Sequence, residues 1–158
     1  MTPFELRSSL DASYRGALER LMYFNPRQHE LQTGIADVVD AYGTPIIVCD
    51  DAGLHVSVDR RPDAQCLFAL TGTSAGLTLA GLIVFLRSSI EEMLVLHVAV
   101  ADGFGRNRRL SLEVVLVLVG AVRDTAHRLR GTKHFRMLYL PASRMTAAGG
   151  GLTAGAAG

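Results

Sequence analysis

The sequence predicts a mixed α/β domain of the α+β kind, with two N-terminal helices, about five antiparallel strands, a long apolar helix and a last strand. Short apolar runs separated by turn residues fill positions 46–100, which is typical of a meander of strands. A strongly apolar segment then continues at helical spacing from 110 to 130, and a short β-rich run follows at His134–Leu140. The length of 158 residues fits one domain.

Two helices are expected before the strands. The first has an apolar face that recurs at steps of three and four residues, formed by Leu6, Leu10, Tyr14, Ala17, Leu18, Leu21 and Met22. Asn25-Pro26 is expected to end it. A second, shorter helix is predicted over 28–42, and the segment Gly43-Thr44-Pro45 stops it.

The strand region begins with a hairpin signal. Asp50–Gly53 has turn chemistry, because Asp and Gly accept the dihedral angles of a tight reversal. We therefore interpret Asp50 and Asp51 as turn residues. Further turns or loops are expected at 60–63, 72–76 and 87–91. The strands predicted between these turns are Ile46–Cys49, Leu54–Asp59, Cys66–Leu70, Leu77–Leu86 and Met93–Val100.

The segment after these strands fits two structures. Residues 112–122 are β-branched enough for a strand, but the apolar spacing continues to Leu129, and Gly131 is a good C-terminal stop. We therefore predict a helix over 110–130, with Ser111 as N-cap or first-turn residue. Because its first half is apolar nearly all round, it must pack against a sheet and against something else.

The domain is expected to span residues 1–141. The final strand, 134–140, carries Tyr139, which we interpret as a core residue, and Pro141 ends the strand. Residues 142–158 read as a flexible Ala/Gly-rich tail, with 149–158 the most mobile part.

Composition excludes several classes of protein. A net charge of +1 argues against a protein that wraps nucleic acid by bulk charge. The longest apolar stretch, Val114–Val122, is far shorter than the roughly 20 residues of a membrane helix. The N-terminus lacks the apolar core of a secretion signal, so a cytoplasmic protein is expected. Cys49 and Cys66 are interpreted as reduced core thiols, and no Cys/His spacing indicates a metal site.

One constellation could carry chemistry. A predicted strand at 93–100 leads through a glycine-bearing turn to a basic loop, and a helix follows. The first turn of a helix offers unsatisfied N–H donors and a partial positive charge, so it can hold a phosphate. Arg106, Arg108 and Arg109 would add charge-assisted hydrogen bonds at the same end. Their like charges oppose the helix dipole, and a bound anion would relieve that repulsion. A solvated arginine loop without a ligand is the alternative.

The order of these elements resembles the GNAT superfamily of acyl-CoA-dependent N-acyltransferases. The similar segments are the run Leu79–Arg87, with Ala80-Gly81-Leu82-Ile83, and the central strand Leu96-His97-Val98-Ala99-Val100. A helix at 110–130 and a strand at 134–140 follow in the family's order. The resemblance covers roughly residues 64–141.

The resemblance implies that acetyl-CoA or another acyl-CoA lies between splayed strands and donates its acyl group to a small-molecule or peptide amine. Its pantetheine arm would pair with the central strand, and the loop 105–111 would hold its pyrophosphate. The implied cofactor-binding residues are Val98, Val100, Gly105, Arg106, Asn107, Arg108, Arg109 and Ser111. Backbone N–H groups would stabilise the tetrahedral oxyanion. Glu92 and His97, on the central strand, are the candidates for the base; the alternatives are a solvated carboxylate and a core histidine.

The sequence also departs from the family's pattern. The family's phosphate-binding turn has glycines at positions that Arg106–Leu110 occupy here, whereas Gly103 and Gly105 come earlier. The family continues past the strand at 134–140 with another helix and two strands, which usually supply a general-acid tyrosine. We therefore expect a divergent member that is short at its C-terminus and either active or degenerate.

Two other interpretations stay open. The stretch Pro45-Ile46 to Gly53 resembles the first hairpin of PAS-type sensory domains, in which "Pro-Ile-x-x-x-Asp-x-x-Gly" recurs, and would imply a non-catalytic sensory or regulatory module. Alternatively, the protein is an oligomeric interaction protein whose apolar segment 112–122 is covered by a partner. A homodimer is compatible with all three hypotheses, and no nucleic-acid or membrane partner is expected.

Overall fold

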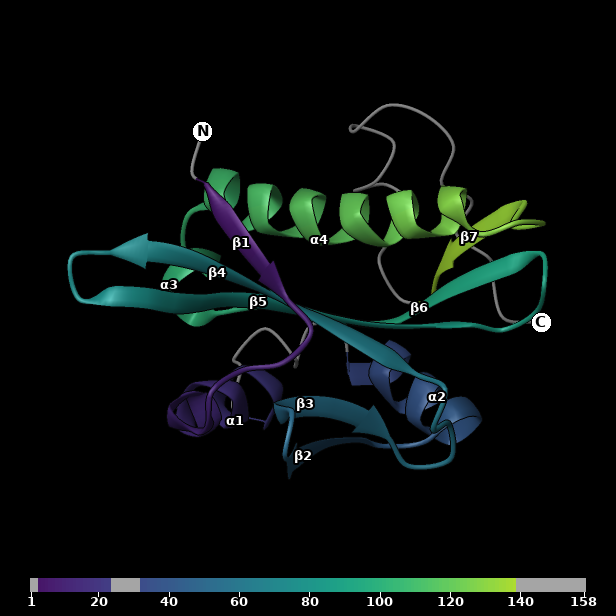
Figure 1. The fold of residues 1–158 in the computed structure, drawn as a ribbon, viewed down its shortest axis with the longest axis horizontal. Helices are drawn as coiled ribbons and strands as arrows, with labels where there is room; N and C mark the ends of the chain where they lie inside the picture. The colour runs from purple at the N-terminus through teal and green to yellow at the C-terminus, as the bar shows by residue number, and fades with distance from the viewer. Residues whose placement is uncertain (1–2, 24–31, 139–158) are drawn as a thin grey trace.

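The computed structural model describes residues 3–23 and 32–138, and within them it has the mixed α+β architecture that the sequence predicts. One five-stranded mixed sheet forms the centre of the fold, in the order β1-β4-β5-β6-β7 (Figure 1). β6 and β7 are parallel, and the other neighbours are antiparallel. The strands of this sheet are β1 (Phe4–Arg7), β4 (Gln65–Thr73), β5 (Gly76–Arg87), β6 (Glu92–Val100) and β7 (His134–Met137).

Helices cover both faces of this sheet. On one face lies α4 (Arg108–Arg128), which connects β6 to its parallel neighbour β7. On the other face lie the short elements of the N-terminal half, together with a separate two-stranded sheet (Figure 1). The remaining elements are η1 (Ala12–Tyr14), α1 (Arg15–Tyr23), α2 (Gln32–Tyr42), β2 (Pro45–Asp50), β3 (Gly53–Val58) and α3 (Asp102–Gly105).

Each face of the sheet buries its own hydrophobic cluster. Alternate residues of β4, β5 and β6 point to opposite faces, as the period of a strand requires. Phe68, Leu82 and Leu94 join Leu18 of α1 and Leu54 of β3 in one cluster. The cluster on the α4 face includes Ala69, Ile83, Phe85, Val95, Val114, Leu118 and Val122. Because both faces are buried, the central strands read as continuous apolar runs.

The prediction of the first helix is wrong for its first residues, which form a strand. Residues Phe4–Arg7 form the edge strand β1, whose Leu6 pairs with Ala69 of β4, and helical structure begins only after Asp11. Asp11 accepts a hydrogen bond from the backbone of Ser13 and thereby caps the first helical turn. Pairing with β4 satisfies the backbone of this segment, and this tertiary term outweighs the helical spacing of its apolar residues. Residues 24–31, including Asn25-Pro26, lie outside the described part of the chain.

The predicted hairpin forms, but it does not join a single meander. β2 pairs only with β3 among the described strands, and β3 is tied to the chain before α1 by the Leu10–Leu54 bridge. Both backbone hydrogen bonds of this bridge measure 2.8 Å. Gly53 has a φ of +105°, and a Cβ there would stand 2.5 Å from the carbonyl oxygen of Leu10. This close approach requires glycine and holds the hairpin over the N-terminal segment.

Residues 112–122 are helical, within an α4 that begins two residues before the predicted start and ends two before the predicted end. Its inner face is fully buried on the sheet, through Val114, Leu118 and Val122. Within the described part of the chain, the second cover expected for its apolar surface is incomplete, because Leu112 and Leu116 remain 49% and 46% exposed. The predicted core residue Tyr139 and the tail lie outside the described residues.

Gly81 of β5 allows α4 to sit directly on the sheet. A Cβ at this position would stand 2.5 Å from a methyl carbon of Val114 and 2.9 Å from the carbonyl oxygen of Ala99. Real Cβ atoms do not approach other atoms so closely, and the Ala99 carbonyl cannot move away because it belongs to the neighbouring strand β6. The absence of a side chain therefore sets the distance between helix and sheet.

Gly81→Ala should therefore destabilise the protein by roughly 1–3 kcal/mol, the usual cost of overpacking a close-packed core. Chemical denaturation followed by circular dichroism measures this loss. Gly72→Ala is the matched control on the neighbouring strand β4, because a Cβ at Gly72 meets no atom within 4 Å. Equal stability of Gly81→Ala and the wild type would contradict the packing described here.

Candidate functional site

The segment between β6 and α4 begins with a helical turn rather than an open loop. The N–H groups of Phe104 and Gly105 both donate to the carbonyl of Ala101, at 2.9 and 3.0 Å, which closes the short helix α3. Gly105 is buried, whereas the four residues that follow it are exposed. The basic segment is therefore a compact bend of few residues that leads straight into α4.

Asn107 caps the N-terminus of α4. Its side-chain oxygen accepts hydrogen bonds from the N–H groups of Arg109 and Leu110, at 3.0 and 3.3 Å. Ser111 is a first-turn residue and not the N-cap, since its N–H donates to the carbonyl of Asn107 at 2.9 Å. The cap occupies donors that a phosphate would use. The sequence signal for this cap is Asn107 itself, because Asn is a favoured N-cap residue and α4 begins directly after it at Arg108.

Three arginines surround this capped terminus. Arg106, Arg108 and Arg109 are all exposed, and Arg109 is paired with Glu113 one turn later, at 3.4 Å. The pair is worth little in water, because the Arg109 side chain is 84% exposed. The guanidinium groups of Arg106 and Arg108 therefore dominate the charge at this end of α4, and they suit an anion that approaches from solvent.

Within the described residues, β6 has two neighbouring strands along its first half and one along its second. Its first four residues, Glu92–Val95, pair in parallel with β7, and its second half continues to Val100 beside β5. The register of the β5–β6 pair shifts between Val84 and Phe85, so Leu96 is an extra residue on β6. Such a bulge bends a strand and increases its twist. The bulge therefore lies one residue after the last pair that the structure describes between β6 and β7.

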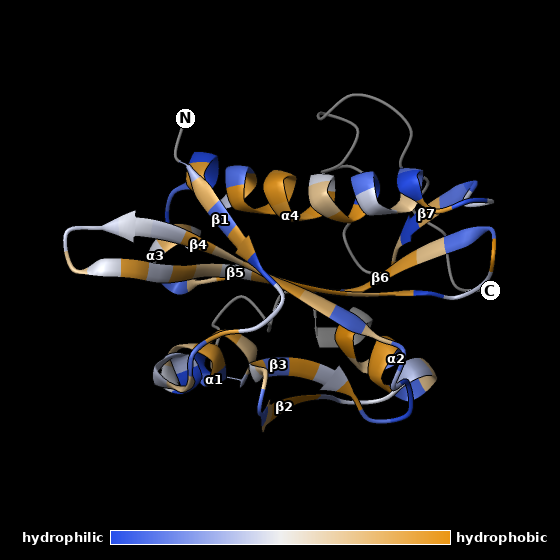
Figure 2. Cartoon of the chain, viewed as in Figure 1, coloured by the Kyte–Doolittle hydropathy of each residue, from blue (hydrophilic) through white to orange (hydrophobic). Residues whose placement is uncertain are grey.

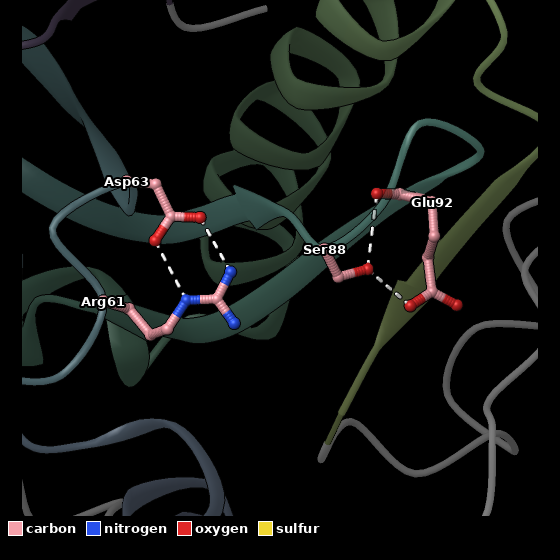
Figure 3. Close-up of polar contacts among 4 residues, drawn as sticks. All are labelled: Arg61, Asp63, Ser88 and Glu92. Atoms are coloured by element: carbon pink, nitrogen blue, oxygen red, sulfur yellow. Dashed lines mark hydrogen bonds and ion pairs between the residues drawn. The ribbon is translucent and has the colours of Figure 1, made fainter.

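Glu92 is held at the first residue of β6 by two neighbours. Ser88 donates a hydrogen bond to its carboxylate at 2.6 Å (Figure 3), and Arg136 of β7 lies 3.0 Å from the second oxygen. The Arg136 contact is an ion pair without the alignment of a hydrogen bond. Glu92 therefore ties β7 to the turn before β6, a structural role that neither of its expected interpretations described.

His97 is buried on the opposite face of the sheet from α4. It pairs with Val84, whose side chain belongs to the cluster on the α1 face. Burial lowers the pKa of the imidazole to about 4, so His97 is neutral near pH 7. Five residues of strand separate it from Glu92, which corresponds to roughly 16 Å. The structure therefore brings the cofactor-binding candidates together at one end of β6 but keeps the two catalytic candidates apart.

Outside this segment, one ion pair and the two cysteines were further candidates for a role. Arg61 and Asp63 form a two-point contact in the loop before β4 (Figure 3). Cys66 is buried, which raises the pKa of its thiol, and it accepts a hydrogen bond from the backbone of Val56. Cys49 is exposed on β2, so its expected core position is wrong. No cluster of His, Cys, Asp or Glu in the described residues could hold a metal ion.

Comparison with known proteins does not identify a family. No family model matches the chain, and no curated protein matches it either. Among the helices of the described residues, none combines the length and the apolar character that crossing a membrane requires.

The buried His97 should make stability depend on pH. Its pKa is lower in the folded protein than the 6.5 of a free imidazole, so the unfolded chain binds more protons below pH 6.5. Stability should fall by roughly 3 kcal/mol as the pH drops from 6.5 to 4 because of this residue alone. Denaturation at a series of pH values measures the loss, and His97→Leu should show a shallower dependence. The same dependence in both proteins would contradict this assignment, as would an NMR titration of His97 near pH 6.5.

Proposed function

We propose that this protein binds an acyl-CoA through the second half of β6 and the first turn of α4, as a divergent GNAT-like N-acyltransferase would. The observation that carries the proposal is the pair of exposed arginines, Arg106 and Arg108, in the bend that leads from β6 to the N-terminus of α4. The described pairing of β6 with β7 covers Glu92–Val95, and β6 continues from there directly into this bend. The order of β4, β5, β6, α4 and β7 also matches the order on which the GNAT resemblance rests.

The pantetheine arm would lie along the backbone of Val98–Val100. The side chains of Val98 and Val100 point to the α4 face, since both are packed into the cluster there. Backbone groups of a strand lie in the plane of the sheet, at right angles to such side chains. An extended amide-bearing chain that follows this edge of β6 would lie beside the core, in exchange for the interactions that Val98 and Val100 already make. The bulge at Leu96 would place a backbone N–H near the thioester carbonyl.

The pyrophosphate would bind at the N-terminus of α4. Arg106 and Arg108 supply charge there, and the helix dipole adds a favourable partial charge. Because Asn107 already accepts from two N–H groups, the proposed contact relies on the guanidinium groups more than on the helix backbone. This division of roles accounts for arginines at positions where the GNAT pattern has glycines.

The support for acyl transfer is weaker than that for binding. Glu92 is engaged by Ser88 and Arg136, and a pKa of about 4 makes His97 a weak base. The proposal therefore assigns the described residues to cofactor binding, with an amine that reaches the thioester already deprotonated. The PAS-type alternative gains no support from the hairpin, because β2 and β3 stand outside the main sheet.

Coenzyme A should raise the melting temperature of the protein in a thermal-shift titration. At a free ligand concentration about 100 times Kd, the stabilisation is about 2.7 kcal/mol. The double variant Arg106→Ala/Arg108→Ala should lose most of this ligand effect, because it removes the two arginines at the proposed pyrophosphate site that have no acidic partner among the described residues, whereas Arg109 is paired with Glu113.

Arg128→Ala/Arg130→Ala is the matched control, since it removes the same charge at the opposite end of α4. The control should respond to coenzyme A like the wild type. A wild-type melting temperature that does not change with coenzyme A would contradict the proposal. So would a ligand effect that both double variants lose equally, because it would show attraction by net charge alone.

A further inference from the structure

α4 carries an apolar stripe on its outer face that no described element covers. Leu112 and Leu116 lie one turn apart and are about half exposed. In Figure 2 the middle of α4 is apolar, and both of its ends are polar. Leu6 of β1 adds a third exposed leucine on the same face of the sheet, because it pairs with Ala69, which packs against α4.

The outer stripe combines two protruding side chains, Leu112 and Leu116, with a neighbouring position that has no side chain. Gly120 follows Leu116 by one turn, and a Cβ at Gly120 would meet no atom within 4 Å. Residues at spacings of three and four share one side of a helix. By this spacing the stripe consists of Arg109, Leu112, Leu116, Gly120, Arg123 and His127.

We propose that this stripe is the interface of a homodimer in which two α4 helices pack antiparallel, with Leu116 of each copy against Gly120 of the other. A twofold axis between residues 116 and 120 makes the surface self-complementary, as a closed dimer requires. Leucine fills the space that glycine leaves, so the two helices can approach closely. In the antiparallel arrangement the two helix dipoles also point in opposite directions, which is favourable for helices that lie side by side.

The charges on α4 select this register. With Leu116 opposite Gly120, Glu113 of one copy lies level with Arg123 of the other, and twofold symmetry repeats this opposite-charge pair. In one copy alone, Glu113 pairs with Arg109, and Arg123 lies over the ring of Phe135, so the dimer would add a second partner to each. A register one turn away, with Leu116 on the axis, would set Arg109 against Arg123, two like charges. A parallel arrangement would set Arg109 against its own copy. Of these three arrangements, the proposed register is the one that combines the leucine contact with attractive charge pairs.

Sedimentation velocity of the full chain over a range of concentrations tests the dimer. The wild type should show a reversible monomer–dimer equilibrium. Leu116→Glu and Gly120→Leu should each weaken association about tenfold or more, since they bury a charge or fill the gap. Gly120→Leu should leave the monomer folded, because a Cβ at this position meets no atom within 4 Å; circular dichroism checks this. Ile90→Glu, at a 72% exposed residue of the β5–β6 turn, is the control and should dimerise like the wild type.

Charge reversal tests the register separately. Glu113→Arg should weaken the dimer, and Glu113→Arg/Arg123→Glu should restore it. The rescue can arise only between copies, because ten residues of helix separate the two positions by about 15 Å within one chain. A wild type that stays monomeric at every concentration would overturn the proposal. A dimer that Leu116→Glu and Gly120→Leu leave intact would also overturn it, since association would then use another face.

Discussion

The close packing of α4 against the sheet at Gly81 is the constraint on which the rest of the structure depends. Val114 and Leu118 reach the backbone of β5 because Gly81 has no side chain. The helix then buries the α4 face of the sheet, and its length carries the chain from the end of β6 back to the start of that strand. β7 can therefore pair in parallel with the first residues of β6. A helix held further from the sheet would leave both the core and this pairing incomplete.

The two ends of α4 are fixed by different interactions. Asn107 caps the N-terminus with its own side chain. At the other end, Arg87 donates to the carbonyls of Ile90 and Arg130, each at 2.6 Å, and so joins the β5–β6 turn to the loop before β7. Gly131, with a φ of +88°, reverses the chain beside Ile90. Together, the contacts at both ends of α4 fix the position of Arg106 and Arg108 relative to the C-terminal end of β6. A ligand site at that end of β6 requires such a fixed position.

The sequence predicted most elements because their signals are local. Turn chemistry at Asp50–Gly53 and the apolar runs around it located the strands, and Gly131 marked the stop after α4. The errors concern long-range partners. Nothing local distinguishes Leu6 on an edge strand from Leu6 on a helix, and the pairing of Leu10 with Leu54 cannot be read from spacing. The exposure of Leu112 likewise depends on what lies beside the helix.

The candidate site was predictable only as a segment. Arg106 and Arg108 lie together and exposed at the start of α4, as the pattern indicated. The roles of individual groups depended on geometry: Asn107 is a cap, Glu92 has a partner on β7, and His97 is buried on the far face. Charge and residue type show where an anion could bind, but they do not show which hydrogen-bond donors are already used.

An NMR measurement of distances between α4 and the sheet tests the central claim most directly. In protein with labelled methyl groups, the account predicts strong nuclear Overhauser effects from the Val114 and Leu118 methyl protons to the α-protons of Gly81. Comparable contacts from Leu112 or Leu116 methyl groups to Gly81 should not appear, since these side chains lie on the outer face. If Gly81 showed no contact with Val114 or Leu118, or contacted the outer leucines instead, the packing of α4 proposed as the basis of this fold would be wrong.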